Sequence, residues 1–428
     1  MKKAFFVGIK GVGMTSLALA YQDVGWEVSG SDVAESFITD DILSTRKITI
    51  LSPLTVPIPK DTTLVIYSGA YDKPETAVRT LTLAEALAEF VQERRVIAVA
   101  GVGGKTTTSA MLAALFHASN RDVGYYVGTG SIGGLPAPGH AGQDSIYIIE
   151  ADEYAISKTD KRPKFALLNP EIVVTTNVIH DHPDVYPTPS DTLAAFVNLI
   201  KSIKVGGTWV HSPADPLTRQ ILEGQVRTIK ERQINLVSYG TDFTQVKLQV
   251  FGAQNQLDAK AAVAAAVASG MTAEDAARGI YSYGGAGRRQ ELHGEIEGRL
   301  LYDDYGHHPE EIKVTIQSFK EHYPGRRLLL VFESHTYTRT EGLLPEFAKA
   351  ISLADLSFIM PIFESAREKG QKHEITTKVF AALIPGAAAL TWGNAADIVW
   401  AASREGDVIL TMGAGFVYKL HDQFKLLK

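Results

Sequence analysis

VIAVAGVGGKTTTSA, residues 96–110, is the stretch that decides how the rest of the chain folds. Its first five residues are apolar, which predicts a buried strand over residues 96–100. A glycine turn follows, and a helical pattern rich in alanine and leucine runs from residue 109 to about residue 116. A strand, a glycine turn and a helix N-terminus in this order form an anion site. The residues of the turn and just after it are Gly101, Gly103, Gly104, Lys105, Thr106 and Thr107.

This turn is predicted to bind the phosphates of a nucleotide. We expect its backbone N–H groups to point at phosphate oxygens, Lys105 to supply a positive charge for the β- and γ-phosphates, and the Thr106 hydroxyl to bind Mg²⁺. The spacing is shorter than the common G-x-x-x-x-G-K-[ST] pattern, but Gly101 still allows the loop to wrap around an anion. The alternative is a glycine-rich turn with a chance lysine. The strand before the turn and the Lys-Thr-Thr after it favour nucleotide binding.

Length, charge and composition limit the class of protein. The chain has 428 residues, too many for one hydrophobic core, so two or three domains are expected. The net charge of −6 argues against a nucleic-acid surface, and the absence of cysteine excludes disulfides, thiol nucleophiles and cysteine-based zinc sites. No uncharged apolar run reaches the ~18 residues of a membrane helix, and the N-terminal run is interrupted too early for a signal peptide. We expect a soluble, cytoplasmic protein with no nucleic-acid or membrane partner.

The N-terminal part of the chain is predicted to form a Rossmann-like α/β unit. A strand at residues 4–7 leads into the glycine turn GIKGVG, which precedes a helix and a second strand. Asp32 lies about 20 positions past the glycines, where a ribose hydroxyl would lie in such a unit. A further strand at residues 63–67 ends at Ser68, at the edge where these sheets bind ligands. Because GIKGVG is not a clean G-x-G-x-x-G, a ligand site and a tight turn without a ligand both stay open.

Titratable and amide side chains follow the strands of the middle part. A strand at residues 145–149 leads into EADE, residues 150–153, whose carboxylates are expected Mg²⁺ ligands beside a phosphate loop; a solvated acidic loop is the alternative. A strand at residues 172–175 leads into HDHPD, residues 180–184, which is predicted to be a metal site or a phosphate-facing loop. The predicted turn at residues 252–255 carries Asn255, an amide of the kind that reads an adenine edge or caps a helix.

The C-terminal part repeats the alternation of strands and helices. Before it, GGAGRR at residues 284–289 reads as a linker with an arginine pair that could reach phosphates. Strands are predicted at residues 299–302, 327–332 and 408–412, and each ends in a polar or glycine-rich segment. Strands that alternate with helices indicate an α/β sheet, so the chain is predicted to contain three such domains in series.

The ordered set of motifs resembles that of the Mur ligases, the ATP-dependent amino-acid ligases of peptidoglycan synthesis. The matching segments span nearly the whole chain in the family's order. Within the family, they are most similar to the branch that joins L-alanine to UDP-N-acetylmuramate. The segments are FVGIKGVGMTSLA with VSGSD, GVGGKTTT, EADE, TTNVIHDHPD, GAGRRQE, YDDYGHHPEEI, HTYTRT, SAREKG and MGAG.

The resemblance implies an architecture and a reaction. It implies a Rossmann-like UDP-sugar domain at residues 1–93, a P-loop ATP domain at residues 94–294 and a Rossmann-like amino-acid domain at residues 295–428. The muramyl carboxylate would attack the γ-phosphate of ATP, and the amine would attack the resulting acyl phosphate. The implied cofactors are ATP and two Mg²⁺ ions. The implied partners are UDP-N-acetylmuramate and an amino acid or short peptide, and the chain would be a monomer or a homodimer.

The resemblance also implies roles for individual residues. For the UDP-sugar these are Gly11, Val12, Gly13, Met14, Asp32 and Ser68. For ATP they are Gly101, Gly103, Gly104, Lys105, Thr106, Thr107, Asn255, Arg289 and Asp304. The implied Mg²⁺ ligands are Thr106, Glu150 and His182, with His182 on the second ion. Tyr305, His308 and Arg339 would bind the amino acid. The implied catalytic residues are Lys105, His182, Arg289 and His308.

Some positions depart from the alanine-adding pattern. Gly103 stands where that branch has a histidine, and Thr336 stands where it has an arginine that helps to hold the amino-acid carboxylate. EADEY at residues 150–154 and FES at residues 332–334 are similar to the related ligase that returns an intact tripeptide to UDP-N-acetylmuramate. L-Alanine, another amino acid and the tripeptide therefore all stay open as the amine.

Two other classes of function compete with a ligase: a nucleotide-binding scaffold and a nicotinamide dehydrogenase. A nucleotide-binding scaffold without catalysis is the alternative, and the presence of Lys105, Thr106, Glu150 and His182 argues against it. A nicotinamide dehydrogenase is disfavoured because it leaves the phosphate loop unexplained.

Overall fold

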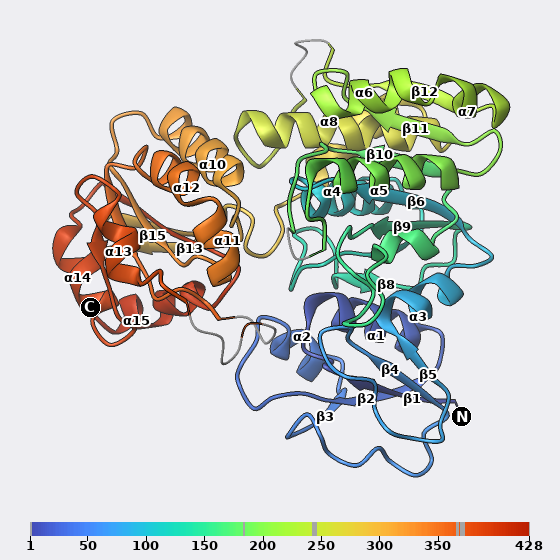
Figure 1. The fold of residues 1–428 in the computed structure, drawn as a ribbon, viewed down its shortest axis with the longest axis horizontal. Coiled ribbons are helices and arrows are strands. Elements are labelled where there is room, and N and C mark those ends of the chain that lie inside the picture. The colour runs from blue at the N-terminus through green and yellow to red at the C-terminus, as the bar shows by residue number, and fades with distance from the viewer. Residues whose placement is uncertain (1, 183–184, 242–245, 365–367, 369–372, 428) are drawn as a thin grey trace. The chain divides into compact units, whose positions relative to one another are not determined.

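The chain folds into three sheets in two compact units, seen here in a computed structural model (Figure 1). It describes every residue except 1, 183–184, 242–245, 365–367, 369–372 and 428. The first unit consists of Met1–Val250 and Asn255–Ala286, and the second of Phe251–Gln254 and Gly287–Lys428. In the described part of the chain, no helix is long and apolar enough to cross a membrane.

The first sheet is parallel, with the spatial order β3-β2-β1-β4-β5. Its central strand is buried on both faces, since Phe5 and Phe6 point into different hydrophobic clusters. The strands are β1 (Lys3–Val7), β2 (Glu27–Ser31), β3 (Thr49–Leu51), β4 (Leu64–Tyr67) and β5 (Thr80–Thr82). The helices are α1 (Val12–Asp23), α2 (Asp40–Thr45) and α3 (Leu83–Phe90).

The second sheet has the order β12-β11-β10-β6-β9-β7-β8 and is parallel except for the β7–β8 pair. Because β6 lies between β10 and β9, the loop after β6 lies beside the ends of both strands. The strands are β6 (Arg95–Ala100), β7 (Gly124–Tyr126), β8 (Gly139–His140), β9 (Ile146–Glu150), β10 (Ile172–Thr175), β11 (Thr208–His211) and β12 (Asn235–Ser238). The helices are α4 (Lys105–Ala118), η1 (Lys164–Leu167), α5 (Pro189–Ser202), α6 (Pro216–Gly224), α7 (Val226–Glu231), α8 (Ala253–Ala268), α9 (Ala273–Gly279) and η2 (Ile280–Ser282).

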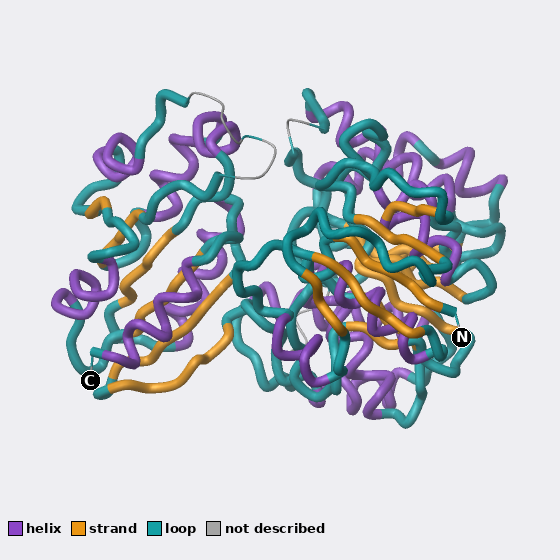
Figure 2. Tube along the Cα trace, turned by 90° about the horizontal axis from the view of Figure 1, so that it is seen from below, coloured by secondary structure: helices purple, strands orange, loops and turns teal. Residues whose placement is uncertain are grey.

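The third sheet lies in the second unit and has the order β13-β14-β18-β15-β16-β17. Only the β13–β14 pair is antiparallel, so the carboxyl ends of β14, β18 and β15 share one edge. The strands of each sheet are flanked by helices (Figure 2). The strands are β13 (Glu291–Ile296), β14 (Arg299–Asp304), β15 (Leu328–Phe332), β16 (Leu356–Ile359), β17 (Ala388–Ala389) and β18 (Val408–Met412). The helices are α10 (Pro309–His322), α11 (Tyr337–Gly342), α12 (Leu344–Ile351), α13 (Thr377–Ala382), α14 (Ala395–Ala402), η3 (Val417–Lys419) and α15 (Leu420–Leu426).

Within the first unit, helix α1 packs tightly against the β7–β8 hairpin. An ideal Cβ built on Gly139 would lie 2.0 Å from the backbone oxygen of Ser16. The Ser16 hydroxyl donates to the Val127 carbonyl at 2.6 Å. The His140 ring contacts Asp23 of α1 at 2.7 Å, and this carboxylate raises the pKa of the imidazole. The first two sheets are therefore joined by backbone contact as well as by side chains.

Several predicted boundaries are corrected by the structure. Helix α4 begins at Lys105 and not at residue 109, because Gly104 takes a left-handed conformation (φ +83°) at its N-cap. Helix α8 begins at Ala253, so Asn255 lies in its first turn and the expected turn at residues 252–255 is wrong. Strand β13, residues Glu291–Ile296, belongs to the third sheet and spans the expected boundary at residue 294.

The α1–β8 contact predicts a site that tolerates no side chain. Gly139→Ala is expected to lower the free energy of unfolding by about 1–3 kcal/mol, because the added methyl group meets backbone atoms that cannot rotate away. Thermal unfolding of the full chain measures this as a lower Tm. Gly224→Ala in α6 is the control, since a Cβ there meets nothing within 4 Å, and its Tm should stay at or above that of the wild type. Equal melting temperatures for both variants would contradict the packing.

Candidate functional site

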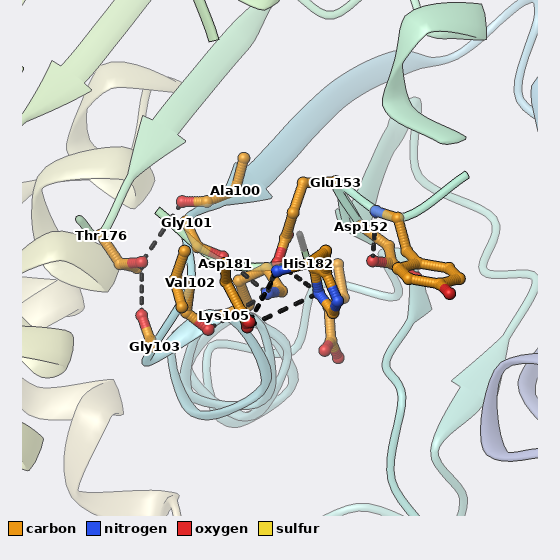
Figure 3. A network of polar contacts seen from close by, with 12 residues as sticks. Ala100, Gly101, Val102, Gly103, Lys105, Asp152, Glu153, Thr176, Asp181 and His182 are labelled. Carbon is orange, nitrogen blue, oxygen red and sulfur yellow. Dashed lines mark hydrogen bonds and ion pairs between the residues drawn. The ribbon is translucent and has the colours of Figure 1, made fainter. Parts of the chain in front are cut away.

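The phosphate loop between β6 and α4 is held in shape by the end of the neighbouring strand β10. Asn177 Oδ1 accepts hydrogen bonds from the Val102 and Gly103 N–H groups at 2.9 and 3.0 Å. The Thr176 hydroxyl donates to the Gly103 carbonyl at 2.6 Å (Figure 3). An ideal Cβ on Gly101 would lie 2.0 Å from that hydroxyl, and Gly101 has a φ of +142°, so glycine is required there on two grounds.

The expectation that the turn's N–H groups are all free to face phosphates is wrong for Val102 and Gly103. Asn177 already accepts both of these donors. The first turn of α4 begins at Lys105, and the first N–H groups of a helix have no acceptor within it. The groups of this loop that suit an anion are therefore the α4 N-terminus and the Lys105 ammonium.

The Lys105 ammonium is fixed by three groups that surround it: the Gly101 carbonyl, the Val102 carbonyl and the Glu153 carboxylate. Its Nζ donates to the Gly101 carbonyl at 2.6 Å and lies 2.9 Å from Glu153 Oε2 and 3.0 Å from Oε1 (Figure 3). Burial lowers the pKa of Lys105, but the charges of Glu153, Asp152 and Glu150 outweigh burial and raise it above its usual value. Lys105 therefore carries its positive charge at neutral pH.

The three carboxylates of EADE have different partners. Glu150 accepts a hydrogen bond from the Thr106 hydroxyl at 2.7 Å and from the Gly128 N–H at 2.6 Å. Asp152 forms an ion pair with Lys164 at 2.6 Å, while Glu153 faces Lys105. Burial raises the pKa of Asp152, but the charges of Lys164 and Lys105 lower it below its usual value. The structure thus brings together Thr106 and Glu150, two of the three predicted metal ligands.

His182, the third predicted metal ligand, lies beside the same carboxylates. Its Nε2 is 3.5 Å from Glu153 Oε1 and 3.7 Å from Asp181 Oδ2 (Figure 3). Its ring packs edge-on against Tyr154. Its φ of +55° is unusual for a residue with a side chain and turns the chain sharply at this point. Pro183 and Asp184, which complete the predicted motif, lie outside the described residues.

The glycine turn of the first sheet is built around Asp32. This buried carboxylate accepts hydrogen bonds from Lys10 N–H at 2.7 Å and Val33 N–H at 2.8 Å, so it ties the end of β2 to the turn. Burial raises the pKa of Asp32 in spite of these two donors. The structure places Gly11, Val12 and Gly13 at the start of α1 and Ser68 directly after β4.

Met14 differs from the other residues predicted for the UDP-sugar. Its side chain is buried in the hydrophobic core that also contains Leu17 of α1. Only the backbone of Met14 is therefore suited to contact a ligand.

In the second unit, Asp304, Tyr305 and Arg289 lie together at the end of β14. The Asp304 carboxylate accepts hydrogen bonds from Gly306 N–H at 2.7 Å and Gln290 N–H at 2.9 Å. Burial raises the pKa of Asp304 to about 6, although the charge of Arg289 acts in the opposite direction. The Arg289 guanidinium lies 5.2 Å from the centre of the Tyr305 ring, within cation–π distance.

His308 and Arg339 are buried near the N-termini of two helices of the second unit. His308 caps α10, because its Nδ1 accepts a hydrogen bond from the Glu310 N–H at 3.3 Å. Arg339 lies in α11, whose N-cap is Thr336 with a φ of +70°. That conformation is strained for a β-branched residue.

Most of the predicted SAREKG segment lies outside the described residues, because residues 365–367 and 369–370 are among those left undescribed. The described residue within it, Glu368, accepts hydrogen bonds from the N–H groups of Tyr337 and Thr338, each at 3.0 Å. The carboxylate of Glu368 is therefore bound at the start of α11.

Sequence reasoning gave no separate role to three residues that organise the central site. Asn177 and Thr176 shape the phosphate loop, and Glu153 holds its lysine. The signal for Asn177 and Thr176 was their position directly after β10, because β10 pairs with β6, the strand that leads into the phosphate loop. The signal for Glu153 was its place as the third acid of EADE.

Three family models cover most of the chain. Residues 3–95 match the Mur ligase family catalytic domain, residues 99–266 the Mur ligase middle domain, and residues 288–415 the glutamate ligase domain of Mur ligases. A UDP-N-acetylmuramate–L-alanine ligase from Desulfitobacterium hafniense is 32% identical over 450 residues, which cover 97% of this chain and 97% of that protein. The chain belongs to the Mur ligase family. The family and the three-domain α/β fold predicted from the sequence are confirmed.

Further relatives of this Mur ligase share its length and its fold. A UDP-N-acetylmuramate–L-alanine ligase from Lactobacillus delbrueckii is 29% identical and covers 99% of the chain. The solved UDP-N-acetylmuramate–alanine ligase of Thermotoga maritima superposes with a TM-score of 0.77 at 21% identity, and each chain is covered completely. The murein peptide ligase of Psychrobacter arcticus superposes with a TM-score of 0.76 at 23% identity, covering 100% of this chain and 98% of that one. Mur ligases are ATP-dependent ligases, which agrees with the predicted use of ATP.

Glu333 is a buried acid under the glycine turn that follows β18. Its Oε2 accepts a hydrogen bond from Val417 N–H at 2.8 Å and lies 2.4 Å from the position of an ideal Cβ on Gly415. Arg288 is buried nearby in an ion pair with Asp303 at 2.7 Å. Burial raises the pKa of Glu333 to about 7, and the charge of Arg288 offsets only part of this increase.

The raised pKa of Glu333 predicts a pH-dependent stability. The folded protein keeps this proton up to about pH 7 while the unfolded chain loses it near pH 4.5, so the free energy of unfolding falls as pH rises through this interval. Glu333→Gln removes the charge and should raise the stability at pH 8 by about 3 kcal/mol relative to wild type, with little change at pH 4.5.

Thermal unfolding of the full chain at pH 4.5 and pH 8 measures this difference. Glu346→Gln, at an exposed position of α12, is the control and should change neither value. A Glu333→Gln variant that is no more stable than wild type at pH 8 would contradict the burial effect.

Proposed function

We propose that this Mur ligase joins the amino group of an amino acid or peptide to the carboxylate of UDP-N-acetylmuramate and converts ATP to ADP and phosphate. The proposal is carried by the similarity, over nearly the full chain, to relatives named UDP-N-acetylmuramate–L-alanine ligase. L-Alanine is the first amine expected from those names. The Lys105–Glu153 and Thr106–Glu150 pairs at one phosphate loop support an active nucleotide site.

The proposed reaction has two steps. A carboxylate oxygen of the sugar acid attacks the γ-phosphorus, and the bond to the β–γ bridging oxygen breaks to release ADP. The amine nitrogen then attacks the carbonyl carbon of the acyl phosphate, and phosphate leaves as the amide forms and the nitrogen loses its proton. In the first step the Lys105 ammonium would offset the charge that develops on the phosphate oxygens. Its fixed position between the Gly101 carbonyl and Glu153 supports this role.

The residues at the loop fit a magnesium ion. The described residues contain no cluster of three histidine or acidic side chains around a common point. Mg²⁺ commonly takes only one or two protein oxygens and fills its other positions with phosphate and water, so the paired oxygens of Thr106 and Glu150 suit it. When bound, Mg²⁺ would neutralise charge on the transferring phosphoryl group. His182 would hold a second ion, a role supported by its position next to Glu153.

The remaining predicted roles are kept as part of the proposal. The UDP-sugar would lie on the turn that contains Gly11, Val12 and Gly13, with Ser68 nearby and Asp32 holding the turn in shape. Nucleotide contacts are proposed for Thr107, Asn255, Arg289 and Asp304, and amine contacts for Tyr305, His308 and Arg339. Each of the three sheets would belong to a separate domain, in a monomer or a homodimer.

The tripeptide is a second candidate for the amine. It is favoured by EADEY and FES in the sequence, and a murein peptide ligase is among the proteins that share the fold. Thr336 replaces an arginine expected in the alanine-adding branch, and a threonine cannot hold a carboxylate with two parallel hydrogen bonds. The two candidates differ only in the amine, so one assay separates them.

An amine panel tests the proposed function. ADP release is measured with ATP, Mg²⁺ and UDP-N-acetylmuramate, and the amine is L-alanine, another amino acid or the tripeptide. We expect turnover that requires both the sugar nucleotide and one amine, and mass spectrometry should detect the new amide. Tight ATP binding without ADP release in any mixture would instead favour a nucleotide-binding scaffold.

The Thr106 hydroxyl is predicted to be required for the magnesium-dependent step. Thr106→Val removes the hydroxyl that contacts Glu150 and should lower kcat by about 100-fold, since it removes a predicted metal ligand. Thr106→Ser keeps the hydroxyl and should retain most of the activity. Titration of Mg²⁺ against the rate of ADP release measures both variants. An unchanged magnesium requirement in Thr106→Val would remove Thr106 from the site.

A further inference from the structure

Two consecutive tyrosines end strand β7, and they point to opposite faces of the second sheet. Successive residues of a strand alternate between faces. Tyr126 packs into the hydrophobic cluster that contains Met14 and Leu17 of α1, and Tyr125 packs into the cluster on the other face. Tyr126 therefore faces α1 and the glycine turn.

The Tyr126 hydroxyl lies against the first turn of α1. Tyr126 is only 7% exposed, and its Oη lies 2.3 Å from the position of an ideal Cβ on Gly13. Among the described residues, the structure shows no hydrogen bond to this hydroxyl, and the atom is not one of the fully buried side-chain atoms without a partner, so water or a ligand can reach it. A ligand oxygen that reaches this hydroxyl can replace water as its hydrogen-bond partner.

The position of Tyr126 is between two parts of the proposed site. In the β7–β9 pair it is in register with Ile149, one residue before Glu150. Two residues further along the chain, Gly128 N–H binds the Glu150 carboxylate at 2.6 Å. The other side of the Tyr126 hydroxyl is the turn that carries Gly13. A ligand that extends from the turn to Glu150 has to pass this hydroxyl, and all of these residues belong to the first compact unit.

The charge around Tyr126 favours a neutral donor at this point. Burial and the negative charges of Asp152 and Glu150 raise the pKa of the Tyr126 phenol well above its usual value, so it keeps its proton. A sugar-acid carboxylate that approaches Glu150 would be repelled by the negative charges of Glu150 and Asp152. A buried O–H that donates a hydrogen bond offsets part of that repulsion.

We propose that the Tyr126 hydroxyl donates a hydrogen bond to an oxygen of the sugar-acid part of UDP-N-acetylmuramate and so directs its carboxylate toward Glu150 and the phosphate loop. This inference rests on the proposed function, because it needs a sugar nucleotide on the glycine turn. Tyr126 is a specificity residue in this role: it contacts the part of the substrate that plain UDP lacks.

Calorimetric titration of the full chain with UDP and with UDP-N-acetylmuramate, in the absence of ATP, tests this contact. Tyr126→Phe removes one oxygen and keeps the ring. We expect it to weaken binding of UDP-N-acetylmuramate by about tenfold, as for the loss of one hydrogen bond, and to leave the affinity for UDP unchanged.

Tyr125→Phe is the matched control. The Tyr125 hydroxyl is fully buried and has no hydrogen-bond partner among the described residues, and its side chain packs into the cluster on the opposite face of the sheet. Its removal should change neither affinity.

Each other outcome has a distinct meaning. Equal affinity of Tyr126→Phe and wild type for UDP-N-acetylmuramate would overturn the inference and leave the proposed function intact. An equal loss for UDP and for UDP-N-acetylmuramate would also overturn it, because the hydroxyl would then act only through the shape of the turn. A wild-type protein that binds UDP-N-acetylmuramate no better than UDP-N-acetylglucosamine would count against the proposed function itself.

Discussion

The ion pair between Lys105 and Glu153 is the interaction on which the central site depends. It crosses from the phosphate loop after β6 to the acidic segment after β9, and it lies where water is largely excluded. A buried charge is stable only with a close partner of opposite sign, so each residue of the pair requires the other. The same acidic segment supplies Glu150 to Thr106, and the loop is held from its other side by Asn177. Residues that follow three neighbouring strands therefore hold the proposed nucleotide site together.

Much of this arrangement could be predicted from the sequence because its signals are local. The strands Ile172–Thr175 and Val408–Met412 have the predicted bounds, since each is a continuous apolar run that ends in polar or glycine residues. Local patterns did not reveal contacts between distant residues. Asn177 meets the phosphate loop only because β10 and β6 are neighbours in the sheet, and Asp32 binds Lys10 N–H only after β1 and β2 have paired.

Proteins that share this fold differ in the amine that their names give, which is alanine in one solved structure and a murein peptide in another. The family is identified from the whole chain, whereas the proposed amine contacts Tyr305, His308 and Arg339 are three side chains of the second unit. Thr336, at the start of α11, caps the helix by accepting a hydrogen bond from the Arg339 N–H, and no sequence pattern predicts its left-handed backbone. Such strain persists only where the surrounding structure enforces it.

The close packing of α1 on β8 also has a consequence for substrate length. With backbone atoms in contact at Gly139, α1 cannot approach the second sheet further, and the hydrogen bond from Ser16 to Val127 resists separation. The glycine turn and the phosphate loop are thereby kept at a constant spacing within the first unit. A sugar nucleotide whose acid group lies too near its diphosphate, or too far from it, could bind at one end without reaching the γ-phosphate. Under the proposed function, the joint between the first two sheets would select substrates by the distance between their diphosphate and their acid group.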